Sequence, residues 1–329
     1  MGLRGGVAID LGTVNTLIWV QGRGLVLEEP SAIAVDGRSG RVTAIGAAAD
    51  ALADKEPQDI NVIHPLRDGV IADMDATAEM LSSFLRKAGR GGSPGLRARR
   101  ALVCVPAGAT WVERRSVAAV LGARRPRYET DLIDEPVAAA AGAGFDLTGG
   151  AGGFVVDIGG GTSEVAAVAG WRVVRAKSLR MAGNAMDEAI INAVRSELNM
   201  ILSPRAARQL KTDLGLSGGP ESAEAVGLDA ARRTPRVERV PAELVANALN
   251  PIVAMIGRTV HEILSDIPSG LAEDIVRGKL RLAGGGALLP GLAGRVEEVA
   301  EIGTVVAEDP LRCVVRGAAA MLEAGPTAT

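Results

Sequence analysis

Two stretches of the chain share one pattern of apolar and turn-forming positions. In each stretch an apolar run reaches an aspartate, a turn rich in glycine and threonine follows, and a second apolar run leads away. The first copy centres on Asp10 and spans residues 5–20, and the second centres on Asp157 and spans residues 152–168. A strand, a tight turn and a returning strand predict a β-hairpin. Two such hairpins that face each other would hold a phosphate chain between their turns, which predicts a two-lobed nucleotide-binding protein.

Strand patterns alternate with helix patterns along the rest of the chain. Short apolar runs predict strands at 25–35 (interrupted at Pro30), 42–45, 101–106, 280–283 and 305–306. Apolar stripes at helical spacing predict helices at 47–53, 75–87, 110–121, 137–143, 184–198, 204–214, 241–264 and 311–322. We expect Asp75 to cap the second of these helices. Residues 217–239 are polar and irregular, with room for a short strand pair near 237–240. The alternation predicts an α/β fold.

The length and composition of the chain indicate two domains and argue against nucleic-acid binding. A chain of 329 residues is too long for one ordinary core, so two domains are expected. Aromatic residues make up only 2% of the chain, which argues against a surface that stacks on nucleic-acid bases. The net charge of -3 provides no general attraction to DNA. We therefore expect no nucleic-acid partner.

The cysteines and histidines carry no sign of a metal site. Cys104 and Cys313 both lie in apolar runs, where buried reduced thiols are expected, and His64 and His261 are isolated. The sequence has no signal-peptide pattern and no apolar run long enough to span a bilayer. We therefore expect a cytoplasmic protein.

Three glycine clusters carry the candidate ligand chemistry. At the first turn, Gly12 and Thr13 let the backbone approach a phosphate, and Asp10 could order the waters around Mg²⁺. At the second turn, tight apolar strands flank three successive glycines at 159–161, so a loose glycine-rich loop explains them poorly. A phosphate in close contact with the main chain would explain them. The third cluster, residues 284–286, ends a strand and opens a helix, whose N-terminus favours anions. All three clusters in this order are more specific than any one.

Two adjacent carboxylates lie where a strand gives way to a helix. Asp134 or Glu135 could orient a water for attack on a γ-phosphate, and the alternative is a helix cap. No Gly-x-x-x-x-Gly-Lys-Ser/Thr loop follows the first strand, and no Gly-x-Gly-x-x-Gly opens a helix there. The ordinary P-loop and dehydrogenase architectures are thus disfavoured.

The order and spacing of these motifs resemble the actin-like ATPase superfamily, and within it the bacterial MreB/Mbl family of rod-shape-determining proteins. The matching segments are 9–18, 65–73, 103–106, 135–140, 157–162, 186–191, 284–289 and 307–311. The resemblance covers nearly the whole chain. It implies a two-lobed fold with duplicated core domains, each with a smaller subdomain, and a nucleotide in the central cleft.

The resemblance also implies domain bounds. The first lobe would cover 1–146, with a small subdomain at about 33–65, and the final helix, 310–325, would return to it. The second lobe would cover 147–309, with a small subdomain at about 182–249.

The family's ligand contacts carry over residue by residue. The resemblance implies phosphate contacts at Gly12, Thr13, Val14, Asn15, Gly159, Gly160, Gly161 and Thr162, adenosine contacts at Gly284, Gly285, Gly286 and Ala287, and base and ribose contacts at Arg208 and Lys211. Asp10 and Asp157 would hold Mg²⁺ through water. Asp134 would take the position of the family's water-orienting glutamate.

The implied function is an ATP-binding, weakly ATP-hydrolysing protein that forms filaments and directs cell-wall synthesis. Its implied partners are further copies of itself, the cell-wall elongation machinery and the inner face of the cytoplasmic membrane. Some residues depart from the family pattern. Asp134 is one methylene shorter than the usual glutamate, which predicts slow hydrolysis. Residues 1–6 lack an amphipathic helix, and the loop 89–100 offers one large apolar residue, Leu96, beside a basic cluster at 97–100.

Three alternatives remain open at this point. A nucleotide-binding adaptor of the same fold would neither polymerise nor hydrolyse ATP, as the departures at Asp134 and in the loops allow. A small-molecule kinase would need a substrate pocket and a catalytic aspartate between the lobes, and the chain has no sugar-kinase motif. A chaperone-type ATPase would need a substrate-binding domain after residue 329.

Overall fold

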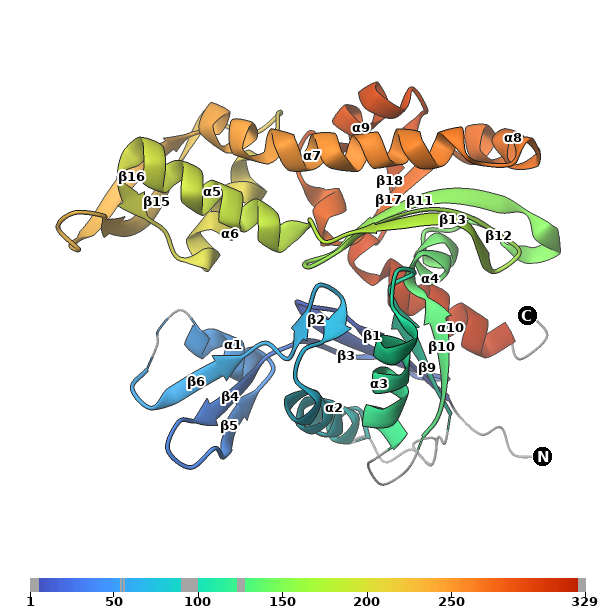
Figure 1. The fold of residues 1–329 in the computed structure, drawn as a ribbon, viewed down its shortest axis with the longest axis horizontal. Coiled ribbons are helices and arrows are strands. Elements are labelled where there is room, and N and C mark those ends of the chain that lie inside the picture. The colour runs from blue at the N-terminus through green and yellow to red at the C-terminus, as the bar shows by residue number, and fades with distance from the viewer. Residues whose placement is uncertain (1–5, 54, 56, 90–99, 123–127, 325–329) are drawn as a thin grey trace.

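Two five-stranded sheets with the same topology form the centres of two lobes (Figure 1). The computed structural model describes residues 6–53, 55, 57–89, 100–122 and 128–324. In spatial order, the first sheet contains β10 (Glu129–Asp134), β9 (Arg100–Val105), β1 (Gly6–Leu11), β2 (Asn15–Val20) and β3 (Gly24–Pro30). The second contains β13 (Arg172–Leu179), β12 (Ser163–Ala169), β11 (Gly152–Ile158), β17 (Leu280–Ala283) and β18 (Thr304–Val306). In both sheets three consecutive strands form an antiparallel meander, and two later strands extend the sheet in parallel from its first strand. The predicted duplicated α/β core is confirmed.

Two helices of small residues fill the space between the sheets. They are α4 (Glu135–Gly142) and α10 (Cys313–Ala324), which share a core with one face of each sheet. A β-carbon on Gly317 would overlap the carbonyl oxygen of Ala138, and one on Gly142 would overlap that of Cys313. The two helices therefore cross at backbone contact, which only glycine at these positions permits.

The remaining large helices cover the outer faces. The first sheet carries α2 (Met74–Gly89) and α3 (Trp111–Gly122), while the second carries α7 (Ala242–Ser265), α8 (Ser269–Gly278) and α9 (Leu292–Ala300), with α5 (Gly183–Leu198) packed against α7. Each lobe thus has its own apolar core outside the shared one. No helix within the described ranges is both long enough and apolar enough to cross a membrane.

Each lobe also has a smaller unit on the same side of the molecule (Figure 1). In the first lobe this unit contains β4 (Ile33–Asp36), β5 (Val42–Ile45), β6 (Ile60–Ile63) and α1 (Ala47–Ala53). In the second it contains β14 (Met200–Ile201), β15 (Ser222–Asp229), β16 (Pro235–Pro241) and α6 (Pro204–Leu214). A two-stranded ribbon of β7 (Leu66–Arg67) and β8 (Val70–Ile71) leads from the first small unit back to its core.

Most predicted elements are confirmed, and the helices at 47–53 and 204–214 match residue for residue. The strand pair expected within 217–239 is present, but it is the long antiparallel hairpin of β15 and β16 rather than a short pair near 237–240 in an irregular segment. Only Ala225 and Val240 of this hairpin are buried, so the apolar alternation was too sparse to read. The strand β13 and the helix α8 were not predicted.

Two local predictions also need correction. The amide of Ala76 donates to Asp73 Oδ1 at 2.9 Å, so Asp73 rather than Asp75 caps α2. The third glycine cluster opens a single 3₁₀ turn, Gly285–Leu288, and the α-helix α9 begins only at Leu292. The predictions about residues 1–5, Leu96 and the loop up to residue 99 lie outside the described residues.

Candidate functional site

The turns of the two predicted hairpins meet at the junction of the lobes. A β-carbon on Gly160 would overlap Val14 Cγ2, and one on Gly161 would lie 2.7 Å from Thr13 Oγ1. Both contacts cross from the β11–β12 turn to the β1–β2 turn. Glycine at 160 and 161 therefore lets two backbones approach each other closely, as a shared phosphate site requires.

The β1–β2 turn is held in place by side chains around it. Ser31 Oγ donates to the carbonyl of Gly12 at 2.7 Å, and the amide of Gly69 donates to Thr13 Oγ1 at 2.9 Å. Gly69 belongs to the ribbon of β7 and β8, at a φ of 76°. Thr13 is thus fixed by its hydroxyl rather than free to rotate.

A cavity of about 250 Å³ lies beside these turns. Its lining includes six of the residues predicted to bind the ligand, namely Val14, Asn15, Gly159, Gly160, Arg208 and Lys211. The lining also includes Pro30, Asp50, Gly183, Asn184 and Asp187, which the sequence argument had not assigned to the site. The structure therefore brings parts of both lobes and of α6 to one cavity.

The cationic wall of this cavity is organised by Asp187, a buried residue of α5. Lys211 Nζ lies 2.6 Å from Asp187 Oδ1 and donates to the carbonyl of Gly183 at 2.8 Å, while Arg208 Nε lies 3.3 Å from Asp187 Oδ2. Burial lowers the pKa of Lys211, and the charge of Asp187 opposes that shift. Arg208 remains half exposed. An ammonium and a guanidinium in this setting can bind an anionic or polar ligand.

The third glycine cluster packs against the end of β11. A β-carbon on Gly284 would lie 2.5 Å from Asp157 Oδ1, and one on Gly286 would overlap Ile158 Cγ2. Ala287 is buried, and Gly285 is exposed. None of these residues lines the 250 Å³ cavity, so the structure brings them to the second hairpin but not to that cavity.

Buried and partly buried acids lie near the strand ends at the two turns. Burial raises the pKa of Asp10 to about 7, and burial together with the charges of Asp10 and Glu164 raises that of Asp157 to about 8. Burial and neighbouring carboxylates also raise the pKa of Glu135 and that of Glu164. Asp157 Oδ1 and Glu164 Oε1 are buried without a hydrogen-bond partner in the structure.

This donor set suits a hard divalent cation. Carboxylate oxygens are the ligands that Mg²⁺ prefers, and Mg²⁺ usually retains several waters. No group of three or more His, Cys, Asp or Glu residues among the described residues is arranged to ligate a metal directly. Binding of Mg²⁺ through water at Asp10 and Asp157 fits both observations.

The two carboxylates at the start of α4 have different surroundings. Asp134 forms an ion pair with Arg114 of α3 and makes no side-chain bond to the helix N-terminus, so its carboxylate does not cap α4. Arg114 also donates to the carbonyls of Ala109 at 3.3 Å and Pro106 at 3.5 Å. Glu135 is buried, and its electrostatic neighbours include Glu164, Asp10 and Asp157. The cluster of acids therefore includes Glu135, whereas Asp134 is paired with the guanidinium of Arg114.

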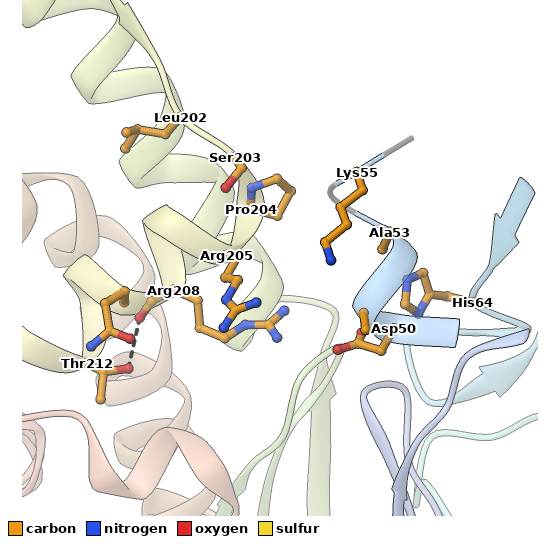
Figure 2. A pocket seen from close by; sticks show the side chains of 12 residues that line it. Asp50, Ala53, Lys55, His64, Leu202, Ser203, Pro204, Arg205, Arg208 and Thr212 are labelled. Carbon is orange, nitrogen blue, oxygen red and sulfur yellow. Dashed lines mark hydrogen bonds between the residues drawn. The ribbon is translucent and has the colours of Figure 1, made fainter. Parts of the chain in front are cut away.

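A wider opening of about 800 Å³ separates the two small units, as Figure 2 shows. Asp50, Lys55 and His64 line it from the first lobe, and Arg205 and Arg208 extend toward it from α6. Asp50 and Arg208 line this opening and the smaller cavity alike. The site is therefore reached from solvent between α1 and α6.

Comparisons with known proteins agree on one family. A family model described as "MreB/Mbl protein" matches residues 4–328. The cell shape-determining protein MreB of Escherichia coli is 41% identical over 327 residues, covering 96% of this chain and 93% of the relative. The cell shape-determining protein Mbl of Bacillus subtilis is 36% identical over 323 residues, covering 96% and 95%.

Solved structures agree with these sequence matches. The crystal structure of MreB5 of Spiroplasma citri bound to AMPPNP superposes with a TM-score of 0.88 at 31% identity, covering 96% of this chain and 95% of that one. The MamK double helical filament gives a TM-score of 0.80 at 22% identity, covering 97% and 99%, a likeness of fold.

Proposed function

The chain belongs to the MreB/Mbl family, and from this premise we propose that it is an actin-like cytoskeletal protein that binds ATP with Mg²⁺ between its lobes, polymerises, and helps to determine cell shape by directing cell-wall synthesis. The observation that carries the proposal is the contact of Gly160 with Val14, which joins two phosphate-type turns from two lobes beside one cavity. The AMPPNP-bound MreB5 structure supports a nucleotide there, because 31% identity extends over 96% of this chain.

We propose the following roles for the site. The two turns, residues 12–15 and 159–162, bind the phosphates, and residues 284–287 form the wall beside the adenosine. Arg208 and Lys211 contact the base and ribose. The lobes would follow the bounds 1–146 and 147–309, with small subdomains at about 33–65 and 182–249 and with the final helix in the first lobe.

The cation would be held by Asp10 and Asp157 through water. Mg²⁺ would neutralise charge on the phosphates during phosphoryl transfer. The unpartnered Asp157 Oδ1 supports this role, because a buried carboxylate oxygen without a donor needs a positive neighbour.

For the residue that orients the attacking water, the geometry favours Glu135 over Asp134. Asp134 is engaged by Arg114, whereas Glu135 is buried among the acids beneath the turns. A weak ATPase coupled to filament assembly is consistent with a single buried carboxylate in this role.

The second candidate is an adaptor of the same fold that binds nucleotide without polymerising or hydrolysing it. The observation that favours it is the Arg114–Asp134 ion pair, because it withdraws one of the two candidate carboxylates. Further partners of the filament form would be the cell-wall elongation machinery and the inner face of the cytoplasmic membrane.

Sedimentation and electron microscopy of the purified chain with Mg-ATP, Mg-ADP or no nucleotide test the proposal. We expect filaments that depend on nucleotide. A chain that binds Mg-ATP and stays monomeric at high concentration would instead support the adaptor, and a chain that binds no nucleotide would refute both.

A further inference from the structure

One buried acid near the site has no part in the proposed function. Glu164 lies on β12, where its side chain is 1% exposed. It is the register partner of Asp157 on β11 and of Ser178 on β13. Directly opposite residues of antiparallel strands share a face, with β-carbons about 4.5–5.5 Å apart. Glu164 therefore lies on the same face of the second sheet as the proposed cation residue Asp157.

One oxygen of Glu164 joins the two lobes. The amide of Ala107 donates to Glu164 Oε2 at 3.0 Å, and the hydroxyl of Ser178 also hydrogen-bonds to the carboxylate. Ala107 belongs to the loop between β9 and α3, in the first lobe. The neighbouring Gly108 approaches Ser178 so closely that a β-carbon there would lie 3.1 Å from Ser178 Cβ. The carboxylate thus fastens a loop of one lobe to the sheet of the other.

The other oxygen, Oε1, is buried and has no hydrogen-bond partner in the structure. The carboxylate of Glu164 interacts electrostatically with three neighbouring acids, Asp157, Glu135 and Asp134. Arg114 is the cation that interacts with it. Arg114 already pairs with Asp134. A buried carboxylate oxygen in this setting is unfavourable unless a cation or a cation-bound water faces it.

We propose that Glu164 is a positioning residue that couples cation binding beside Asp157 to the contact between the lobes. Oε1 accepts a hydrogen bond from a water of the bound cation, while Oε2 keeps the loop at Ala107 in place. Groups that orient metal ligands from outside typically change metal affinity 10–100-fold when they are removed. This inference rests on the proposed binding of a magnesium nucleotide.

The test compares Glu164→Gln with Glu164→Asp and with Glu262→Gln as a matched control. The amide of Gln still accepts from Ala107 but carries no charge, and Asp keeps the charge. Glu262 is an exposed acid of the same lobe, paired with Lys177 at 2.7 Å. Binding of a fluorescent ADP analogue is titrated with Mg²⁺ and, separately, measured in EDTA.

We expect Glu164→Gln to raise the Mg²⁺ concentration for half-maximal binding about tenfold, with unchanged affinity in EDTA. Glu262→Gln should match the wild type, and Glu164→Asp should lie closer to the wild type than Glu164→Gln does. An unchanged Mg²⁺ requirement in Glu164→Gln, an equal loss in EDTA, or equal losses in the Gln and Asp variants would overturn the inference. If the wild type binds no nucleotide with or without Mg²⁺, the proposed function itself fails.

Hydrogen exchange of the Ala107 amide measures the coupling without reference to turnover. Mg-ADP should slow this exchange in the wild type by more than ADP in EDTA does, and the difference should disappear in Glu164→Gln. The same difference in both proteins would overturn the coupling. Thermal melting of each variant without ligand verifies that the variant is folded. If Glu164→Gln is not folded, the Mg²⁺ requirement of Glu164→Asp is compared with that of the wild type instead. A requirement within twofold of the wild type supports the role of the charge, and a larger loss overturns it.

Discussion

Gly160 of the second hairpin turn lies directly against the side chain of Val14 in the first, close enough that a β-carbon at 160 would overlap Val14 Cγ2. The contact joins the two lobes where the cavity begins. The missing side chain at 160 therefore sets the separation of the two turns, and with it the geometry of the proposed phosphate site.

Replacing Gly160 with Ala should force the turns apart and weaken nucleotide binding about tenfold, a loss of about 1.4 kcal/mol. The double variant Val14→Ala/Gly160→Ala removes the overlapping methyl and should recover part of the loss, which binding titrations with Mg-ADP would measure. Gly270→Ala on α8 is the matched control, because nothing lies within 4 Å of its β-carbon and the residue lies outside the proposed site. Equal losses in Gly270→Ala and Gly160→Ala would show that steric separation is not the cause.

Two conservative changes test which carboxylate supports the proposed hydrolysis. Glu135→Gln should lower phosphate release about 100-fold, because a positioned general base typically contributes at least that much. Asp134→Asn should leave the rate near that of the wild type, since Arg114 already occupies this carboxylate. Phosphate release at saturating Mg-ATP is the measurement, and ADP binding verifies that each site is intact. The opposite pattern would return the catalytic role to Asp134.

Sequence alone predicted the fold because its landmarks are local. Asp10 and Asp157 each end an apolar strand before a glycine turn, and chain order alone relates the two hairpins. The contact between Gly160 and Val14 follows from that duplication. By contrast, the full length of the hairpin of β15 and β16 was not predicted, because only a sparse apolar face packs inward and Val226 and Val237 are both exposed.

The contacts around the proposed ligand-binding residues could not be predicted from the sequence, because they join residues that are distant in the chain. Arg114 lies 20 residues before Asp134, and Lys211 lies 28 residues after Gly183, whose carbonyl it reaches. Nothing at Asp187 distinguishes it locally from a solvent-facing acid of a helix. Asp187 is buried because α5 packs against α6, where Lys211 pairs with it, and this packing cannot be inferred from the local sequence.

The crossing of α4 and α10 predicts a large stability effect from one methyl group. Gly317→Ala would bring a β-carbon into the carbonyl oxygen of Ala138, and overpacking of this kind costs about 3 kcal/mol. Gly294→Ala on α9 is the matched control, because nothing lies within 4 Å of its β-carbon. Removing a helical glycine there should stabilise the protein by about 0.5–1 kcal/mol. Urea unfolding of both variants measures the difference, and similar values would contradict the close crossing.

The raised pKa values of Asp10 and Asp157 predict how the stability of the protein depends on pH when neither cation nor nucleotide is bound. The folded state raises the pKa of Asp10 to about 7 and that of Asp157 to about 8, from 3.8 for both. A raised carboxyl pKa means that the folded protein holds its proton at a pH where the unfolded chain has lost it. The contribution of both groups is therefore fully present below about pH 4 and is lost as pH rises through 7 to 8. Each group lowers the free energy of unfolding by at most about 1.4 kcal/mol per pH unit within this window.

Urea unfolding in EDTA at pH 6, 7, 8 and 9 measures this loss. We expect the midpoint to fall between pH 6 and 8 and to change less above pH 8, where both groups are ionised in either state. Asp10→Asn/Asp157→Asn should flatten the decline, because these two groups no longer titrate. Mg-ADP should reverse it, since a bound cation favours the ionised carboxylates that folding alone disfavours. A midpoint that rises from pH 6 to 8 in EDTA would contradict the buried, proton-holding state of Asp10 and Asp157.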